Sequence, residues 1–276
     1  MSGFNSVSVN NIKIGVIGCG HLGQAIAKSL INHGFCKEDI LISYKGNTST
    51  YKKITQLGLD TCISENKKIF NEADVIFITI KPQDIMSLKE ISLSKNILIV
   101  SCIAGLSIEI LKNIFKANIF RVMLSGPDTI VSGKGVAALY PYNELIGSIL
   151  NKMKLCIFEI SREEDMNIFT AGVCLPAALL QEKDEVIIEN AVNEIGIDCA
   201  MFLNLYDWAK KTVPSFNTEI EKTQYISKMI TKGGVTEAII DSLKSGEEFI
   251  TALRKGIARG NNISLEISNS NTVNLE

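Results

Sequence analysis

Residues 11–23 read Asn-Ile-Lys-Ile-Gly-Val-Ile-Gly-Cys-Gly-His-Leu-Gly and decide the fold of the first part of the chain. The apolar run Ile12–Ile17 predicts a buried strand, and the spacing of apolar residues in Ala25–Ile31 predicts one face of a helix. Three glycines join the two: Gly18, Gly20 and Gly23. In such a turn the first glycine permits the tight bend, the second lets a pyrophosphate approach the backbone, and the third lets helix and strand pack closely. The helix N-terminus adds N–H groups and a positive dipole end. The stretch therefore predicts a dinucleotide-binding loop, with an ordinary strand–helix turn as the alternative.

Length and charge exclude several classes of protein. The chain has 276 residues, enough for two domains that each have a core. Its formal net charge of -2 creates no field for nucleic acid or an anionic membrane. No apolar run reaches the roughly 20 residues of a membrane span, and residues 1–10 lack the parts of a signal peptide. We expect a cytoplasmic protein that binds neither nucleic acid nor membrane.

The cysteines do not predict a metal site. They number seven, are scattered and form no Cys-x-x-Cys pair, and only His21 and His33 could add imidazoles. We expect them to be small buried hydrophobic residues in a reducing compartment, and we expect no metal.

Apolar runs alternate with helical patterns up to about residue 161. The expected strands are Ile12–Ile17, Ile40–Tyr44, Val75–Ile80, Ile97–Ile103, Ile119–Met123, Val136–Tyr140 and Cys156–Ile160. The helical spacing between them is clearest at Leu22–His33, Ser49–Leu57, Ile85–Ile91 and Ser107–Phe115. Strands that are apolar on both faces and separated by helices predict a parallel sheet covered on both sides. The expected fold class is α/β, with an N-terminal Rossmann-like, doubly wound parallel sheet.

The remaining residues predict helices alone. Helical spacing recurs at Pro176–Ile195, Asp198–Thr212, Thr218–Ile230, Thr236–Leu243 and Glu247–Arg259, with glycines and a proline between them. We therefore divide the chain into residues 1–162, an NAD(P)-binding domain, and residues 163–276, an all-helical domain. The tail from Gly260 is rich in Asn and Ser and is expected to be loose.

The turn after the second expected strand bears on the choice of dinucleotide. NAD-binding versions carry an acid there, which holds the ribose diol. Residues 43–49 contain no acid. Lys45 and the hydroxyls of Thr48 and Ser49, with Asn47 among them, offer charge and hydrogen bonds to a 2′-phosphate instead. We expect NADP, with NAD as an alternative cofactor and a solvated polar loop as the alternative role of this turn.

From about residue 12 to residue 259 the chain resembles the pyrroline-5-carboxylate reductases, which reduce a cyclic imine to proline with NAD(P)H. The matching segments keep their order and spacing: Ile14–Gly23, Ala73–Gln83, Val100–Gly105, Arg121–Met123, Gly133–Val136 and Thr231–Thr236. The last is similar to the family's Ser-Pro-Gly-Gly-Thr-Thr loop. Beyond the glycines, the resemblance implies cofactor contacts from His21, Leu22, Ile80, Lys81, Pro82 and Ala104.

The segments expected near the substrate depart from the family. Where the family has Met-Pro-Asn-Thr-Pro, residues 123–129 read Met-Leu-Ser-Gly-Pro-Asp-Thr, and the match requires a gap. Where it has Ser-Gly-Ser-Gly-Pro-Ala, residues 172–177 read Gly-Val-Cys-Leu-Pro-Ala, without either serine. In the last loop, Lys232 replaces the proline and Val235 replaces a threonine. The resemblance is therefore specific on the cofactor side and degraded on the substrate side.

The resemblance implies an NADPH-dependent reductase of a cyclic imino acid, with pyrroline-5-carboxylate as the expected substrate and proline biosynthesis as the expected role. The expected catalytic residues are Thr236, Thr129 and Asp128, and Thr236 would hydrogen-bond the substrate or protonate the imine nitrogen. Expected substrate contacts are Thr231, Gly233, Gly234 and Ser125, with Lys232 attracting a carboxylate. Two alternatives stay open: a related oxidoreductase of another imine or oxo acid, and a nucleotide-binding regulatory protein without turnover.

The helical part also predicts assembly. It carries more apolar residues than one small layer can cover, and members of the family exchange such helices across a two-fold axis. We expect a homodimer or a ring of dimers, so that residues 163–276 form a substrate and dimerisation domain. The expected interface residues follow helical spacing: Ile187, Ile188, Ala191, Val192 and Ile195.

Overall fold

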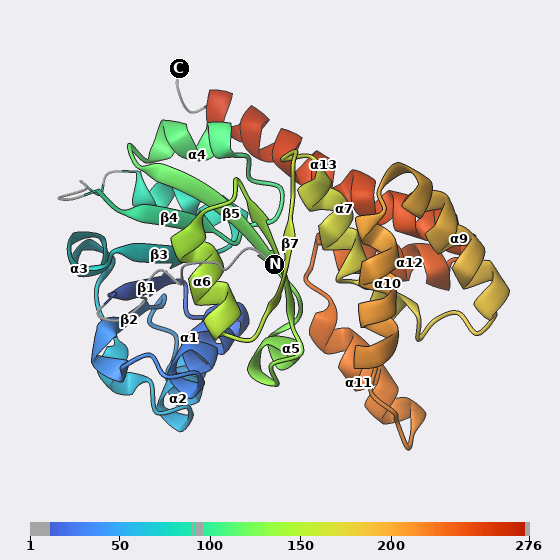
Figure 1. The fold of residues 1–276 in the computed structure, drawn as a ribbon, viewed down its shortest axis with the longest axis horizontal. Coiled ribbons are helices and arrows are strands. Elements are labelled where there is room, and N and C mark those ends of the chain that lie inside the picture. Colours follow the sequence, from blue (N-terminus) through green and yellow to red (C-terminus); the bar gives the residue numbers. More distant parts are fainter. Residues whose placement is uncertain (1–11, 90, 92–95, 274–276) are drawn as a thin grey trace, which may run out of the picture. The chain divides into compact units, whose positions relative to one another are not determined.

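The computed structural model describes residues 12–89, 91 and 96–273, and the chain divides into two compact units, Met1–Ser161 and Arg162–Glu276 (Figure 1). The first unit is built on a seven-stranded sheet with the order β2-β1-β3-β4-β5-β6-β7. Its strands are β1 Ile14–Ile17, β2 Ile40–Ser43, β3 Val75–Ile78, β4 Leu98–Ser101, β5 Asn118–Leu124, β6 Val136–Tyr140 and β7 Cys156–Glu159. All seven expected strands are present, which confirms the α/β class.

The prediction of an entirely parallel sheet is wrong at one pair of strands. β5 and β6 pair antiparallel, whereas every other neighbouring pair is parallel. The connection from β5 to β6 is short and contains only the five-residue helix α5, Pro127–Val131. A parallel pair needs a crossover of a dozen or more residues, so this connection returns the chain in the opposite direction.

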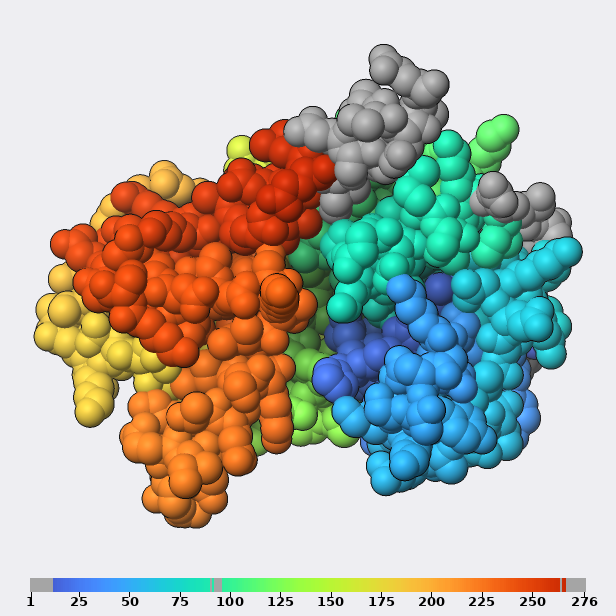
Figure 2. All heavy atoms as spheres, turned by 180° about the vertical axis from the view of Figure 1, so that it is seen from behind, coloured from blue at the N-terminus to red at the C-terminus, as the bar shows by residue number. Residues whose placement is uncertain are grey.

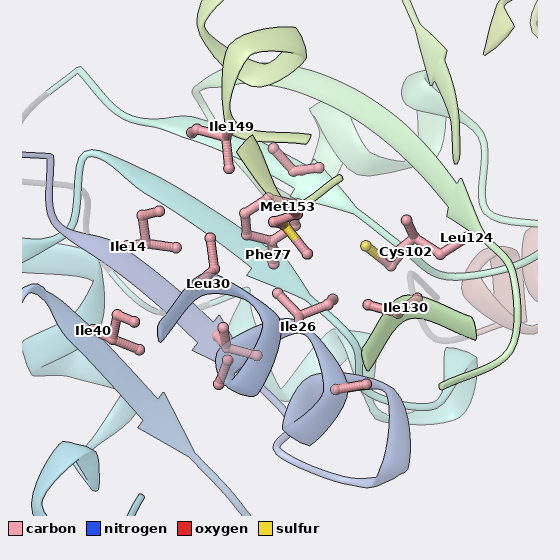
Figure 3. Close-up of a cluster of buried hydrophobic side chains, with 14 of the residues drawn as sticks. Ile14, Ile26, Leu30, Ile40, Phe77, Cys102, Leu124, Ile130, Ile149 and Met153 are labelled. Carbon is pink, nitrogen blue, oxygen red and sulfur yellow. The ribbon is translucent and has the colours of Figure 1, made fainter. Parts of the chain in front are cut away.

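Helices cover both faces of the sheet. The helices of the first unit are α1 His21–Asn32, α2 Thr48–Gln56, α3 Asn66–Glu72, α4 Ile108–Ile114, α5 and α6 Glu144–Lys152, with 3₁₀ helices η1 Lys37–Asp39, η2 Asp60–Cys62 and η3 Pro82–Leu88. The expected helix Ile85–Ile91 is this last 3₁₀ helix. On one face, Figure 3 shows Ile26 of α1, Ile130 of α5 and Ile149 of α6 in one cluster with Ile14 and Phe77 of the sheet.

The opposite face is covered by α3 and the segment after α4. A Cβ on Gly15 of β1 would lie 2.3 Å from Cγ2 of Ile69, so α3 packs directly on the strand. Phe70 of α3 stacks on Phe115 with ring centroids 5.8 Å apart. Because β1 is covered on both faces, its residues are all buried, and the doubly wound arrangement is confirmed.

Helices make up the secondary structure of the described part of the second unit. They are α7 Asp165–Gly172, α8 Leu175–Ala178, α9 Glu185–Asp198, α10 Met201–Thr212, α11 Glu219–Met229, α12 Val235–Lys244 and α13 Phe249–Val273. Their core contains Ile188, Phe202, Ile239 and Leu253 from four different helices. Helix α11 and the segment leading to α12 form part of the surface that is orange in Figure 2.

The expected single helix Pro176–Ile195 is wrong, because the chain leaves helical geometry between α8 and α9. Asp184 caps α9, and its carboxylate accepts hydrogen bonds from the backbone N–H groups of Val186 and Ile187 at 2.9 and 3.3 Å. An aspartate before an apolar helical run is a recognised helix start, so the sequence did contain the signal for this break.

The expectation of a loose tail after Gly260 is also wrong, since α13 continues to Val273. A Cβ on Gly256 would lie 2.5 Å from Cγ1 of Ile239, and one on Gly260 would lie 3.0 Å from Oδ1 of Asn167. Asn167 also donates a hydrogen bond to Oδ1 of Asn261 at 2.6 Å. These glycines therefore allow close helix packing instead of ending the helix, and tertiary contact outweighs the polar composition.

The expected interface face of α9 is mostly buried inside one chain. Ile188, Ala191, Val192 and Ile195 belong to the core of the second unit, because α9 packs on α10 and α13. Of the five residues only Ile187 is exposed, at 45%. The assignment of the other four to an interface is wrong, and the exposed apolar residues of α9 are Val186, Ile187 and Ile197.

Candidate functional site

The glycine loop joins β1 to α1 and leaves space beside its second glycine. Gly18 has φ +95°, and a Cβ there would lie 2.5 Å from Cγ2 and 2.8 Å from N of Ile80. A Cβ on Gly23 would lie 2.7 Å from the carbonyl oxygen of Gly18. A Cβ on Gly20 would meet only that same oxygen, at 3.9 Å. The protein itself therefore requires glycine at positions 18 and 23, whereas at 20 it leaves an exposed backbone that a phosphate group can approach.

Two side chains that the sequence analysis missed hold this loop. Thr79, directly after β3, donates a hydrogen bond to the carbonyl oxygen of Gly18 at 2.8 Å. Gln24, buried in α1, donates to the carbonyl oxygen of Cys19 at 3.0 Å. A threonine at the end of an apolar strand and a glutamine on the inner face of an apolar helix were the available signals, because buried polar groups need partners.

The edge beside the loop is positively charged. The first turn of α1 carries no acid, and His21, its first residue, is exposed while Leu22 is half-buried. The Nζ ammonium of Lys53 lies 3.0 Å from Nε2 of His21, which accepts its hydrogen bond. The N-terminus of α1 and these side chains together favour an anion.

Lys45 follows β2 and is exposed, and its Nζ lies 2.6 Å from Oδ1 of Asp84. This partner lies 39 positions further along the chain and was not among the residues expected here. Asn47 caps α2, since its Oδ1 accepts hydrogen bonds from the backbone N–H of Thr50 at 2.7 Å and the hydroxyl of Ser49 at 3.1 Å. Thr48 begins α2 and is exposed. Asn47 and Ser49 thus stabilise the helix start, and the charge of this turn comes from Lys45.

The other expected cofactor residues follow β3 and β4, whose carboxyl ends lie at the same edge as that of β1. Ile80 packs under Gly18. Lys81 is exposed, and Pro82 opens η3. Ala104 lies half-buried in the turn after β4. The structure therefore brings the expected cofactor residues to one edge of the sheet, where ligands bind in folds of this type.

The hydroxyls of Ser125 and Thr129 bond to each other and to the backbone, and these hydrogen bonds stabilise the segment between β5 and β6. Thr129 donates its hydroxyl hydrogen to the carbonyl oxygen of Gly126 at 2.7 Å. The buried Ser125 hydroxyl lies 2.7 Å from that of Thr129 and accepts a hydrogen bond from the N–H of Val136 at 3.0 Å. Because a hydroxyl has one hydrogen, Ser125 donates to Thr129. Neither hydroxyl has a hydrogen left for a ligand, while Asp128 is exposed on α5.

The loop Thr231–Gly234 in the second unit is held by two charged side chains. The N–H of Gly233 donates to Oε2 of Glu237 at 2.6 Å. Arg259 of α13 donates through Nε to the carbonyl oxygen of Gly233 at 2.8 Å. Gly233 has φ +73°, and a Cβ on Gly234 would lie 2.8 Å from the carbonyl oxygen of Thr231. Both glycines are therefore required by the loop itself, and a carboxylate of the protein already holds one of its N–H groups.

Thr236, in the first turn of α12, contacts a buried thiol. Its Oγ1 lies 3.1 Å from Sγ of Cys174, and that Sγ donates to the carbonyl oxygen of Thr170 at 3.1 Å. Because the thiol has one hydrogen, Thr236 is the donor to Cys174, and the oxygen lone pairs of Thr236 stay available as acceptors. Burial raises the pKa of Cys174 from 9.0 to about 11, although the hydrogen bond from Thr236 lowers it, so the thiol is neutral at physiological pH.

The cysteines divide by environment. All seven are free, and those at positions 19, 62, 102 and 174 are buried. Cys36 and Cys156 are exposed and Cys199 is intermediate, so the expectation of burial is wrong for these three. Cys156 is exposed because it begins the edge strand β7. Across residues 12–89, 91 and 96–273, no group of three or more His, Cys, Asp or Glu side chains could hold a metal ion.

No helix among the described residues is long and apolar enough to span a membrane.

Comparison with known proteins gives one family model and several related proteins. The model "NADP oxidoreductase coenzyme F420-dependent" matches residues 13–105. Pyrroline-5-carboxylate reductase 1 of Dictyostelium discoideum is 22% identical over 191 residues, which are 67% of this chain and 33% of that protein. The pyrroline-5-carboxylate reductase of Corynebacterium melassecola is 26% identical over 193 residues, 65% of this chain and 70% of the relative. The chain thus aligns with one third of the length of the first relative.

A solved structure extends the likeness to the fold. The crystal structure of Plasmodium falciparum pyrroline carboxylate reductase with NADP bound has a TM-score of 0.57 and 22% identity. The alignment covers 93% of this chain and all of that one. At this identity the likeness shows a shared fold, a mostly parallel sheet followed by helices, over nearly the whole chain.

Proposed function

We propose that this chain, a distant member of the pyrroline-5-carboxylate reductase family, is an NADPH-dependent reductase of a cyclic imino acid. The observation that carries the proposal is the space beside Gly20. Atoms of the protein occupy the space beside Gly18 and Gly23, whereas the space beside Gly20 is open. A pyrophosphate would approach the loop at Gly20. No contact of the protein requires glycine at position 20, and the position lies at a helix N-terminus, so the close approach of a dinucleotide's phosphates would account for the residue there.

On the cofactor side, the residues present fit NADP. The N–H groups at the start of α1 would bind the pyrophosphate, and Lys45 would bind the 2′-phosphate. Lys81 and Ala104, at the ends of β3 and β4, would contact the remaining cofactor. The bound cofactor would supply the hydride, and the protein would supply orientation and exclude water.

On the substrate side, Thr236 is the group that we assign to the reacting nitrogen. Its hydrogen is donated to Cys174, so its oxygen would accept a hydrogen bond from the N–H of a protonated imine and hold that proton in place. A protonated imine has a more electron-poor carbon, which is a better hydride acceptor. Lys232, in the loop Thr231–Gly234, would attract the substrate carboxylate, since Glu237 already holds the N–H of Gly233. Asp128 would lie at the nicotinamide end of the sheet.

We propose a homodimer, or a ring of dimers, as the functional assembly. The exposed apolar side chains of α9, Val186, Ile187 and Ile197, support such an assembly. A monomeric mass by light scattering at micromolar concentration would contradict it.

The decisive experiment is turnover by the purified chain, with NADPH or NADH, of pyrroline-5-carboxylate and a panel of other cyclic imines and oxo acids. We expect NADPH-dependent reduction of pyrroline-5-carboxylate that is slower than in ordinary family members, because Cys174 stands where the family has a serine. Turnover of another imine or oxo acid alone would identify a related oxidoreductase. NADPH binding without any turnover would identify a nucleotide-binding regulatory protein.

A further inference from the structure

A carboxylate from another part of the chain lies at the end of β2, although β2 and the residues that follow it contain no acidic side chain. Residues 40–59 contain three lysines and no aspartate or glutamate. The carboxylate is that of Asp84, in the first turn of η3, and its Oδ1 lies 2.6 Å from Nζ of Lys45. An acid therefore stands beside the one cation that we assign to the 2′-phosphate.

The topology explains how the two residues meet. β1 pairs in parallel with β2 on one side and with β3 on the other, so the carboxyl ends of the three strands share one edge. Lys45 follows β2 and Asp84 follows β3, and the ion pair spans the end of β1, where the glycine loop begins. Dinucleotides bind at this edge in folds of this type.

The two partners differ in their freedom to move. The side chain of Lys45 is 71% exposed and that of Asp84 is 21% exposed. An exposed ion pair is weak, so Lys45 can turn toward another anion at little cost. Asp84 is more confined by its surroundings, and its negative charge would stay close to any phosphate that Lys45 binds. The segment of α2 beside this turn lies on the surface that is light blue in Figure 2.

We propose that Asp84 is a specificity-determining residue for the cofactor. Its carboxylate competes with the 2′-phosphate for the ammonium of Lys45 and repels that phosphate, and so it lowers the preference for NADPH over NADH. A phosphomonoester carries a charge of about −1.5 to −2 at neutral pH, whereas NADH carries only a neutral ribose 2′-hydroxyl at this position. The inference rests on the proposed function, since it assumes that this edge binds the adenosine half of the cofactor.

The test is titration of the whole chain with NADPH and with NADH, for wild type and for Asp84→Asn. The substitution keeps the shape of the side chain and removes its charge. We expect NADPH affinity to rise about three- to tenfold at low salt and NADH affinity to change less than about twofold. The gain should shrink as salt is raised, because the interaction is between partly exposed charges. Adenosine 2′,5′-bisphosphate and 5′-AMP should reproduce the difference as smaller probes.

A matched control is Asp39→Asn, which removes the same charge where β2 begins, about 20 Å of strand away from Lys45. It should change neither affinity. In a Lys45→Ala background, the gain from Asp84→Asn should fall, because the ammonium for which carboxylate and phosphate compete is gone.

Three results would overturn the inference alone. They are an unchanged ratio of the two affinities in Asp84→Asn, weaker NADPH binding in that variant, and a ratio that changes only through weaker NADH binding. The last would mean that Asp84 holds a ribose hydroxyl. If wild type binds neither cofactor, the proposed function fails and the inference fails with it.

Discussion

The two glycine-containing loops of this chain, Gly18–Gly23 in the first unit and Thr231–Gly234 in the second, use glycine for different reasons. In the first, a Cβ on Gly20 would meet open space, and the hydroxyl of Thr79 fixes the loop by a hydrogen bond to the carbonyl oxygen of Gly18. In the second, Gly233 and Gly234 are needed for the conformation of the loop, and Glu237 already occupies the N–H of Gly233. Glycine by itself therefore does not indicate a ligand; the atoms that a Cβ would meet show which of these glycines the fold itself requires.

The largest expected effect tests the second loop as part of a substrate site. Replacing Thr236→Ala removes the hydroxyl assigned to the reacting nitrogen, and we expect imine turnover to fall roughly 10- to 1000-fold. NADPH affinity, measured by titration, should stay near wild type, because the hydroxyl would act on the substrate and not on the cofactor.

Thr236→Ser is the matched control, since it keeps the hydroxyl and its hydrogen bond to Cys174, and it should retain most of the turnover. Unchanged turnover in the alanine variant would remove Thr236 from the mechanism and would leave the second loop with a structural role only.

The next effect tests the open position of the first loop. Gly20 has φ −76° and ψ −157°, at the edge of the extended region, so alanine there does not face the strain of a positive φ. Gly20→Ala should therefore keep the melting temperature but weaken NADPH binding about 100-fold, since a methyl group would displace the pyrophosphate from two charge-assisted hydrogen bonds.

Gly18→Ala should behave differently, because that position combines φ +95° with a contact of 2.5 Å to Ile80, and the variant should lose stability as well as binding. Normal cofactor affinity in Gly20→Ala would contradict the assignment of this loop to the pyrophosphate.

A smaller effect tests the choice of cofactor. Lys45→Ala should weaken NADPH binding about tenfold and leave NADH binding unchanged, because one charge-assisted hydrogen bond contributes about 1.5–3 kcal/mol. Titration of both cofactors against wild type and variant measures this. Equal affinities of wild type for NADPH and NADH would contradict a preference for NADP.

The smallest effect concerns stability at alkaline pH. The folded pKa of Cys174 is raised by burial from 9.0 to about 11, so the fold favours the neutral thiol. This contribution is complete below pH 9 and is lost as the pH rises toward 11, because the unfolded thiol ionises first. Urea unfolding should show that wild type loses about 1 kcal/mol more than Cys174→Ala between pH 8 and pH 10.

The exposed Cys36→Ala is the control for this comparison and should lose as much stability as wild type over the same range. Equal losses in wild type and Cys174→Ala would mean that the thiol does not stay neutral in the folded chain.

Local patterns predicted the fold well where neighbouring residues decide it. The seven strands and α1 follow from apolar runs and from the glycines between them. The misses have a common cause: the antiparallel return to β6, the continuation of α13 through Gly260 and the inward face of α9 all depend on what a segment packs against. Gly256 and Gly260 would end a solitary helix, yet here they admit Ile239 and Asn167.

In the candidate site, too, some features follow from the local sequence and others depend on tertiary contacts. Residues 11–23 determined by themselves that a strand, a tight glycine turn and a helix N-terminus would follow one another, because these three features are adjacent along the chain. Only the tertiary structure decided which side chains contact the candidate residues of each unit: Thr79 on Gly18 and Asp84 on Lys45 in the first, and Cys174 on Thr236, 62 positions away, in the second. Such partners come from separate strands and helices, and no local spacing encodes which of them the folded chain brings within hydrogen-bonding distance.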